Sequence, residues 1–346
     1  MKDRKKKIAV IIAVMAIVVA GCDNSRTIND LCEDGHDWNW TEVVWGMETG
    51  ACSHCAEIIE LRLSPGMLVR LPPTGTAPFT FTMGSDDTQD WNAQPAHQVT
   101  LTRGFYMGTH QVTQAQFEAV MGENPSAHAI GGTRESFVEG LDTSRFPVER
   151  VRWFEAIIFC NRLSKLEDLT PAYEIETAEG SNVWSTDPAE WGEVPTGTGH
   201  ENFARWNNVR LVEGSTGYRL PTEAQWEFAC RAGRTTPWNT GDSITQEQAN
   251  FWGAVPLQRT TAVGSFPANA WGLYDMHGNV WEWVWDRGAA YTGEAQTDPI
   301  GASSGSLRVW RGGGWSDGAQ LARSAVRNWF FPSHRYYGLG FRVSRP

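Results

Sequence analysis

Four residues near the N-terminus have the types and the spacing of metal ligands. Cys32 and His36 are separated by three residues, and Cys52 and Cys55 by two. Two close pairs of soft ligands suit a tetrahedral Zn²⁺ ion, which would hold together a segment too short to build a large core. In an exported protein such thiols also tend to oxidise, so a disulfide that leaves one of the three cysteines over is the alternative. We expect residues 32–63 to form a small Cys/His module, with zinc and a disulfide both open.

The extreme N-terminus has the composition of a secretory leader. A basic stretch over residues 1–7 is followed by an apolar run over residues 8–19 and then by small residues. This order is typical of a signal peptide, and the run is shorter than the roughly 20 residues that a membrane-spanning helix needs. Residues 1–21 are therefore predicted to be a signal peptide, which places the mature chain outside the cytoplasm.

Cys22 follows this leader directly. The sequence Val-Ala-Gly-Cys that ends at Cys22 resembles the lipobox of bacterial lipoproteins. The resemblance implies cleavage before Cys22 and acylation of its sulfur, and each acyl CH₂ that enters a bilayer contributes about 0.8 kcal/mol to anchoring. An ordinary signal peptide with an incidental cysteine is the alternative. We expect a lipid anchor at Cys22 in the bacterial cell membrane or outer membrane, followed by a linker over residues 22–31.

The composition excludes one class of partner and predicts an irregular domain. The chain of 346 residues has a formal charge of −11, and its main run of positive charge lies in the removable leader, so the mature protein is more acidic still. Nucleic-acid binding is excluded because it needs clustered Lys and Arg. The 35 Gly and 18 Trp residues indicate many tight turns and large, rigid packing groups whose N–H groups need partners.

Short strands and a few helices must position any site in the larger part of the chain. We place the domain boundary at the break after Leu63, so that the main domain spans residues 64–346. Apolar residues at helical spacing predict a helix over residues 153–166. Residues 175–215 are polar and lack a clear period, which indicates an insert with a hairpin. Alternation predicts strands over residues 58–63, 79–85, 97–102 and 105–108.

Two capping boxes mark the starts of further helices. In each, a threonine hydroxyl caps the first turn and a glutamine three residues later reaches back to the cap. A glycine, Gly122 or Gly233, is expected to end each helix. The pairs are Thr113 with Gln116 and Thr222 with Gln225.

Seven short motifs over residues 66–346 follow one another in an order that resembles the sulfatase-modifying factor, or formylglycine-generating enzyme, family. The resemblance implies an α+β, C-type-lectin-like formylglycine-generating-enzyme fold with much irregular structure. The motifs are Met83-Gly84-Ser85, His97-Gln98-Val99-Thr100-Leu101, Val112-Thr113-Gln114, Arg219-Leu220-Pro221-Thr222-Glu223-Ala224-Gln225-Trp226-Glu227, Gly278-Asn279-Val280-Trp281-Glu282-Trp283, Arg311-Gly312-Gly313-Gly314-Trp315 and Gly340-Phe341-Arg342.

The resemblance stops short of the family's oxidase chemistry. Active members hold copper with a cysteine pair that follows the Gly-Gly-x-Trp/Tyr motif, but residues 315–328 contain no cysteine. Copper(I) needs soft thiolate ligands, so we expect no copper and no active formylglycine-generating oxidase. Related iron enzymes use a His-x₃-His motif, which none of the eight histidines forms. Cys160 and Cys230 are expected to be buried free thiols, although a disulfide between them stays open.

The sequence therefore favours a non-catalytic binding or accessory module at the cell envelope. The alternative is a sulfatase-modifying oxidoreductase or another metal-dependent enzyme of the family. The resemblance implies a binding surface near the C-terminal loops, where aromatic and arginine residues of this sequence gather, and such side chains suit a protein, peptide or saccharide ligand. For Trp315 and Arg327, the alternative is that both side chains only stabilise the fold. The candidate ligand-binding residues are Trp315, Arg327, Asn328, Trp329 and His334.

The resemblance also implies one calcium ion around the Gly-Asn-x-Trp-Glu-Trp motif. Its ligands would be the side chains of Asp275 and Glu282 and the carbonyls of Gly278 and Val280. Oxygen ligands that include carboxylates are those that Ca²⁺ prefers. The alternative is that Glu282 only pairs with a neighbouring arginine.

Overall fold

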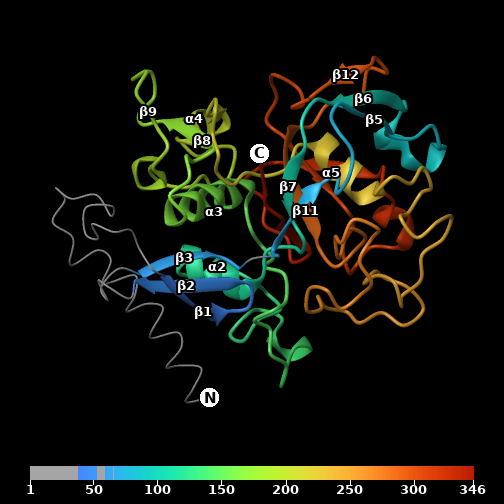
Figure 1. Cartoon of the computed structure of the whole chain (residues 1–346), viewed down its shortest axis with the longest axis horizontal. Helices are drawn as coiled ribbons and strands as arrows, with labels where there is room; N and C mark the ends of the chain where they lie inside the picture. The colour runs from blue at the N-terminus through green and yellow to red at the C-terminus, as the bar shows by residue number, and fades with distance from the viewer. Residues whose placement is uncertain (1–37, 53–58, 65) are drawn as a thin grey trace.

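The computed structural model describes residues 38–52, 59–64 and 66–346 (Figure 1). The predicted signal peptide, the lipidation site at Cys22 and three of the predicted zinc ligands, Cys32, His36 and Cys55, lie outside the described residues. Cys52 is described only as the last backbone position of strand β2. Within the described ranges, no helix combines the length and the apolarity that crossing a membrane requires.

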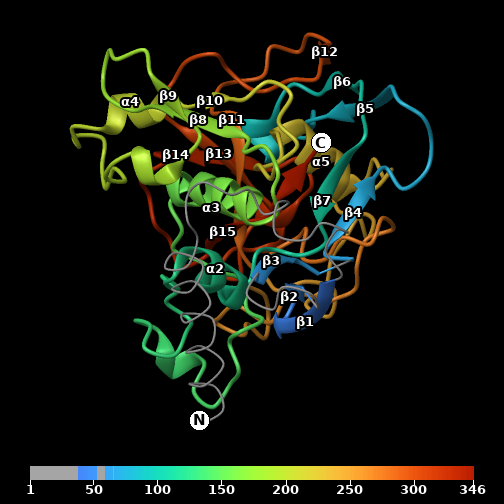
Figure 2. The same ribbon diagram turned by 60° about the vertical axis from the view of Figure 1, so that its left-hand side comes forward.

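The first part of the described chain is a three-stranded antiparallel sheet in the order β1-β2-β3. Met47 of this sheet is fully buried in the core of the larger domain. The Leu63 N–H donates to Glu167 Oε1 at 2.7 Å, which fixes the last strand to the end of a helix. Figures 1 and 2 both show the sheet beside helix α2 (Gln114–Met121). The strands are β1 (Trp38–Val44), β2 (Met47–Cys52) and β3 (Ile59–Leu63).

A four-stranded sheet in the order β14-β13-β11-β15 forms the centre of the larger domain. Strand β15 runs parallel to β11, and the other neighbours are antiparallel. Alternation along β11 directs Trp281, Trp283 and Trp285 to one hydrophobic core and Val284 to another, so the sheet separates two cores. The strands are β11 (Trp281–Arg287), β13 (Arg308–Arg311), β14 (Arg327–Phe330) and β15 (Leu339–Phe341).

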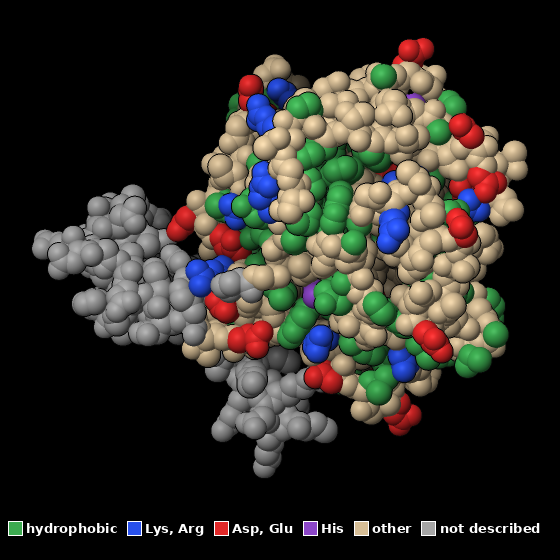
Figure 3. All heavy atoms as spheres, turned by 45° about the vertical axis from the view of Figure 1, so that its right-hand side comes forward, with side chains coloured by type: hydrophobic (Ala, Val, Ile, Leu, Met, Phe, Trp, Pro, Cys, Tyr) green, Lys and Arg blue, Asp and Glu red, His purple; other side chains and the backbone are tan. Residues whose placement is uncertain are grey.

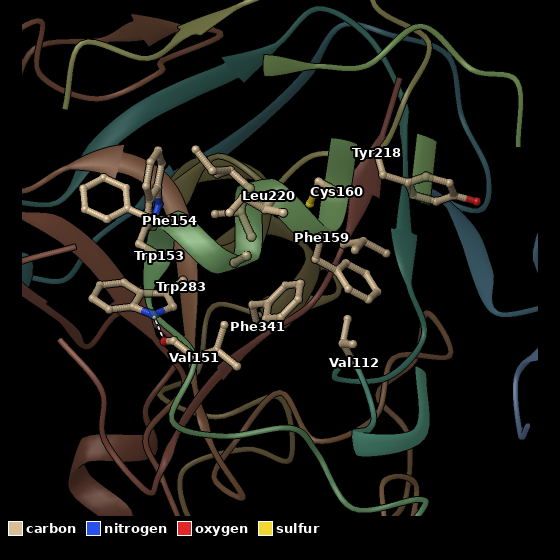
Figure 4. Close-up of a cluster of buried hydrophobic side chains, with 14 of the residues drawn as sticks. Val112, Val151, Trp153, Phe154, Phe159, Cys160, Tyr218, Leu220, Trp283 and Phe341 are labelled. Atoms are coloured by element: carbon tan, nitrogen blue, oxygen red, sulfur yellow. Dashed lines mark hydrogen bonds between the residues drawn. The ribbon is translucent and has the colours of Figure 1, made fainter. Parts of the chain in front are cut away.

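Helix α3 (Trp153–Leu166) covers the tryptophan side of this sheet and has the bounds that the sequence predicts. The Trp153 indole N–H donates to the Val284 carbonyl at 2.8 Å, and the Trp283 indole N–H donates to the Val151 carbonyl at 2.9 Å (Figure 4). These buried indoles therefore find the partners that their N–H groups require.

Helix α5 (Glu223–Arg231) lies against the other side of the sheet. Both predicted capping boxes are confirmed, at Thr113 for α2 and at Thr222 for α5. Helix α2 ends at Gly122 as predicted. The end of α5 comes one residue earlier than Gly233, because Ala232 already adopts the left-handed conformation with φ of 46°.

The remaining elements are short and lie around the two cores. Two three-stranded sheets, in the orders β12-β6-β5 and β16-β7-β4, hold the predicted strands, and a third, β10-β8-β9, contains the predicted hairpin of the insert. The strands are β4 (Leu68–Leu71), β5 (Phe79–Met83), β6 (His97–Leu101), β7 (Phe105–Gly108), β8 (Tyr173–Glu176), β9 (Trp184–Ser185), β10 (Arg210–Leu211), β12 (Gln296–Thr297) and β16 (Ser344–Arg345). The helices are α4 (Phe203–Asn207) and the 3₁₀ turns η2 (Thr88–Ala93), η3 (Glu135–Phe137), η4 (Pro188–Glu190) and η5 (Ala319–Ala322).

Cys160 and Cys230 are buried free thiols, as predicted. Burial raises the pKa of both thiols, that of Cys230 to about 12. Cys230 lies 3.8 Å from a ring nitrogen of His277, but burial lowers the pKa of this histidine to about 4. Because the imidazole is then neutral, it does not stabilise a thiolate, and the pair has no nucleophilic character.

Candidate ligand-binding site

Buried ion pairs between helix α5 and the central sheet fix the start of the C-terminal segment. Arg327 Nε and Nη2 both donate to the Glu223 carboxylate, each at 2.6 Å. Only 3% of Arg327 is exposed. Its guanidinium is fully engaged in this bidentate pair, so we assign Arg327 to the scaffold rather than to the binding face.

The next turn of helix α5 repeats this arrangement. Glu227 accepts hydrogen bonds from Arg231, from Arg311 and from the Gly84 N–H. Burial alone would raise the pKa of Glu227, but the two guanidiniums outweigh burial and hold this pKa below its ordinary value. The carboxylate therefore stays charged, and strand β13 is held against α5.

The opposite side of strands β13 and β14 reaches the surface. Trp310 pairs in register with Asn328, which is exposed, and the rings of Trp310 and Phe330 stack with centroids 6.0 Å apart. The His334 ring lies 4.4 Å from Phe330. Burial lowers the pKa of His334, so its ring is neutral near pH 7 and packs as an aromatic group. Alternation along β14 thus places Asn328 on the outward side, away from Arg327.

Further rings continue this surface toward Trp315. The centroid distances are 6.4 Å from His334 to Tyr336, 4.4 Å from Tyr336 to Tyr337 and 5.6 Å from Tyr337 to Trp315. The C-terminal part of the chain therefore contains one continuous set of rings, which is exposed at Phe330, half-buried at His334, Tyr336 and Tyr337, and buried at Trp310 and Trp315. We call it the aromatic band, consisting of Trp310, Phe330, His334, Tyr336, Tyr337 and Trp315.

An open pocket of about 300 Å³ lies at the Trp315 end of the aromatic band. Its volume is at the lower end of the range for sites that bind small molecules. Half of its lining comes from two loops distant in sequence, and the other half from the C-terminal segment. The lining residues are Arg134, Trp252, Gln258, Trp315, Ser316 and Tyr337.

Trp252 forms one wall and has a fixed backbone. Its N–H donates to the Asp317 carbonyl at 2.7 Å, and Asp317 is itself held by the Trp281 indole N–H at 2.8 Å. The Trp252 side chain is nevertheless 50% exposed and makes no ring contact with any side chain in the described part of the chain. A large apolar ring held open to solvent in this way is a typical contact surface for a ligand.

His128 and Glu149 lie behind the pocket and are completely buried. The His128 ring meets Trp315 edge to face, with centroids 5.2 Å apart. The Glu149 Oε1 atom accepts the His128 backbone N–H at 2.7 Å and lies 3.4 Å from the His128 Nδ1 atom. The pair fixes the loop that leads to Arg134 against the back of Trp315.

The structure divides the five ligand-binding residues predicted from the sequence. Trp315 lines the pocket, and Asn328 and His334 lie on the same surface as the aromatic band. Arg327 and Trp329 lie on the other side of strand β14. The Trp329 ring packs so closely on Gly288 that a Cβ there would lie 2.6 Å from it, so we assign Trp329 to the scaffold as well.

Arg134, Trp252 and Gln258 are pocket residues that sequence reasoning missed. They lie in loops without hydrophobic periodicity, and no short motif surrounds them. Trp252 is recognised only in the structure, as the one tryptophan with an exposed side chain among those whose burial the structure describes. Figure 3 shows that hydrophobic side chains also gather near the middle of another view of the surface, so apolar exposure alone does not identify the pocket.

The predicted calcium ligands surround one point in the loop before strand β11. The carbonyls of Asp275, Gly278 and Val280 and the Glu282 Oε1 atom all lie 3.0 to 3.5 Å from the Nε2 atom of Gln111. Asp275 contributes its carbonyl here, because its carboxylate accepts the Gly264 N–H at 2.8 Å. We call these oxygens the oxygen cage.

The donor atoms of the oxygen cage are of the type that calcium prefers, but the cage has little negative charge. Glu282 is its only carboxylate, and Arg342 pairs with that carboxylate through two hydrogen bonds of 2.7 Å. Gln111 Oε1 is buried without a partner, so rotation of this amide would add one more oxygen ligand. Elsewhere in the described ranges, no three side chains of His, Cys, Asp or Glu meet in a possible metal site.

The geometry can be compared with known proteins. A family model for a sulfatase-modifying factor enzyme 1-like domain matches residues 74–346. The chaperone protein LppX of Paenibacillus barcinonensis is 33% identical over 267 residues, which cover 71% of this chain and 81% of that protein. The formylglycine-generating enzyme of Mus musculus is 31% identical over 295 residues, which cover 76% of this chain and 72% of that enzyme.

One solved structure shares the fold of this chain over almost the whole length of the solved protein. Treponema denticola variable protein 1 superposes with a TM-score of 0.68 at 31% identity, covering 87% of this chain and 99% of that chain. Together with the mixed helices and small open sheets described above, this likeness confirms the predicted α+β, C-type-lectin-like fold.

Proposed function

Because the chain belongs to the sulfatase-modifying factor family, we propose that it uses the fold of that family as a non-catalytic binding module at the cell envelope. The aromatic band and the pocket at its end carry this proposal. Most of the aromatic band and half of the pocket lining come from the C-terminal segment that begins at Trp315, and residues 315–328 of this segment contain no thiol. Rings such as those of Trp252 and Phe330, which are exposed to solvent, suit recognition of a ligand, whereas copper chemistry needs thiolates.

The competing function is oxidation of a sulfatase cysteine. The last cysteine of the chain is Cys230, whose thiol is buried with a pKa of about 12. A buried thiol that stays protonated is a poor nucleophile, and a single cysteine does not supply the thiolate pair that copper uses in active members of the family.

Two measurements test the binding function. The full mature chain is incubated with a sulfatase-derived cysteine peptide, copper and oxygen, and the peptide mass is followed. Formation of the aldehyde would overturn the proposal. The same chain is then applied to arrays of glycans and peptides. We expect binding that a Trp252→Ala, Phe330→Ser double variant loses, and absence of binding to every member of both arrays would also overturn the proposal.

We propose further that an acyl chain on Cys22 anchors this module in a bacterial membrane, with the described domain outside the cytoplasm. The basic and apolar leader and the Val-Ala-Gly-Cys sequence support this proposal. Mass spectrometry of the mature N-terminal peptide should show an acylated cysteine at its first position. An unmodified N-terminus, or unchanged membrane association of a Cys22→Ala variant, would contradict it.

For the metals, we propose a structural calcium ion in the oxygen cage, and zinc in the Cys/His module with a disulfide as its alternative. The oxygen donors around Gln111 support calcium, and the spacing of Cys32, His36, Cys52 and Cys55 supports zinc. Calorimetric titration of chelator-treated protein with CaCl₂ tests the first ion. Elemental analysis with a count of free thiols in the unfolded, chelator-treated protein tests the second, since cysteines that bind zinc stay reduced and react as thiols, whereas those in a disulfide do not.

A further inference from the structure

Arg134 stands out among the arginines near the binding face because it lies against rings and not against a carboxylate. Its Cζ atom lies 4.6 Å from the centre of the Phe137 ring, 4.7 Å from that of Tyr337 and 5.1 Å from that of Trp315. Its Nε atom is buried without a hydrogen-bond acceptor. Arg311 and Arg327, in contrast, each pair with a glutamate.

An unpaired guanidinium at the edge of a pocket favours an anionic group of matching shape. The planar fork of arginine binds the two oxygens of a carboxylate through parallel hydrogen bonds. The rings around Arg134 fix its plane, so little side-chain entropy is lost when such a pair forms. Because the protein as a whole has a formal charge of −11, long-range attraction does not favour an acid. Binding of a carboxylate must therefore depend on Arg134 itself.

The remaining walls of the pocket suit a sugar ring. The exposed face of Trp252 and the ring of Tyr337 can pack on the C–H face of a pyranose, which is apolar although its rim carries hydroxyl groups. The amide of Gln258 and the hydroxyl of Ser316 supply polar groups for that rim. A volume of about 300 Å³ accommodates one sugar unit with its substituents.

We propose that this pocket binds a carboxylate-bearing sugar unit, of the uronic acid or sialic acid class, with its carboxylate on Arg134 and its ring on Trp252. The proposal rests on the binding function proposed above and adds the chemical class of the ligand. In this proposal, Arg134 recognises the charge of the carboxylate and Trp252 recognises the shape of the sugar ring.

Saturation-transfer NMR on the full mature chain tests the proposal with three probes. These are 3′-sialyllactose, an unsulfated disaccharide that carries glucuronic acid, and lactose as the neutral counterpart of the first probe. We expect at least one acidic probe to bind at least about tenfold more tightly than lactose. The acidic probe that binds identifies the sugar class.

Matched variants locate the site. Arg134→Gln and Trp252→Ala should each weaken the acidic probe at least about tenfold. Arg210→Gln is the control, because the Arg210 Cζ atom lies 3.0 Å from the centre of the Trp184 ring in the insert, another arginine stacked on a tryptophan. This control should leave binding unchanged, and circular dichroism should show that all three variants are folded.

Three outcomes would overturn the sugar proposal in different ways. Equal binding of lactose and the acidic probes would remove the role of the carboxylate. Acidic peptides that bind through Arg134 while no sugar does would replace the ligand class but preserve the binding function. Absence of binding to any glycan or peptide on the arrays would overturn the binding function together with this inference.

Discussion

The two sides of strand β14 differ in what surrounds the same kinds of side chain. On the side of helix α5, Arg327 is 3% exposed and forms a bidentate pair with Glu223. On the other side, Phe330 is 42% exposed and belongs to the aromatic band that leads to the unpaired Arg134. The comparison teaches that arginine and aromatic residues serve the scaffold where their partners lie inside the chain, and recognition where their partners are missing.

The largest expected effect comes from removing the buried Arg327–Glu223 ion pair. Arg327→Ala should lower the free energy of unfolding by about 3–5 kcal/mol, because it removes the bidentate partner of the buried Glu223 carboxylate and leaves only Arg311, whose Nε atom lies 3.5 Å away. Arg134→Gln should change it by less than about 1 kcal/mol, since Arg134 is half-buried and has no carboxylate partner. Urea unfolding followed by tryptophan fluorescence measures both. An equally large loss for Arg134→Gln would place Arg134 in the scaffold and contradict its role in recognition.

The next prediction concerns the pH dependence of stability that buried Asp286 produces. Burial and the neighbouring Glu223 raise the pKa of Asp286 to about 7, whereas an unfolded aspartate titrates near pH 4. Between these two pH values the folded state keeps a proton that the unfolded state has lost, so the free energy of unfolding should fall as pH rises. The expected fall from this group is about 3 kcal/mol between pH 4 and pH 7.

Asp286→Asn should remove most of this pH dependence, because the amide keeps an acceptor for the Glu223 N–H without a titrating group. Urea unfolding at pH 4.5, 6 and 7.5 compares the variant with the parent chain. Asp298→Asn is a control at an exposed aspartate and should preserve the parent slope. A variant at Asp286 that keeps the full slope would show that other groups produce it.

A smaller effect concerns the oxygen cage at the start of β11. Gln111→Glu replaces an amide by a second carboxylate among the oxygens around Glu282, so calcium should bind at least about tenfold more tightly, a gain of about 1.4 kcal/mol. Gln111→Leu provides no ligand and should bind calcium no better than the parent chain. Titration calorimetry measures all three proteins. Equal affinities for the glutamate and glutamine forms would place the ion away from Gln111.

Sequence patterns predicted the parts of this fold that depend on neighbouring residues. The capping boxes at Thr113 and Thr222 are local hydrogen-bond patterns, and the apolar spacing over residues 153–166 is a local period, so both are readable without the fold. The motif order predicted the fold class. The binding face that the rings of the C-terminal segment suggest stays a prediction.

The composition of the pocket was not predictable in the same way. Arg134 and Trp252 are distant in sequence, and only the packing of their loops against Trp315 places them together. Whether an arginine has a partner is likewise a tertiary property. The sequence proposed Arg327 for binding, but the register of β14 directs its side chain to helix α5, whereas the neighbouring Asn328 faces outward.

The smallest expected effect is the loss of stability in Phe330→Ser, which is compared with a substitution of its neighbour Trp329 on the other side of β14. Phe330→Ser should cost only about 0.5–1 kcal/mol of stability, since the ring is partly exposed and mainly loses its stacking on Trp310. Trp329→Ser, one residue earlier, removes a ring that packs into the core on the α5 side and should cost at least about 2 kcal/mol. Urea unfolding of the two variants gives the comparison. If Phe330→Ser were as costly as Trp329→Ser, the aromatic band would be part of the folded core, and its exposed rings would no longer support a role in recognition.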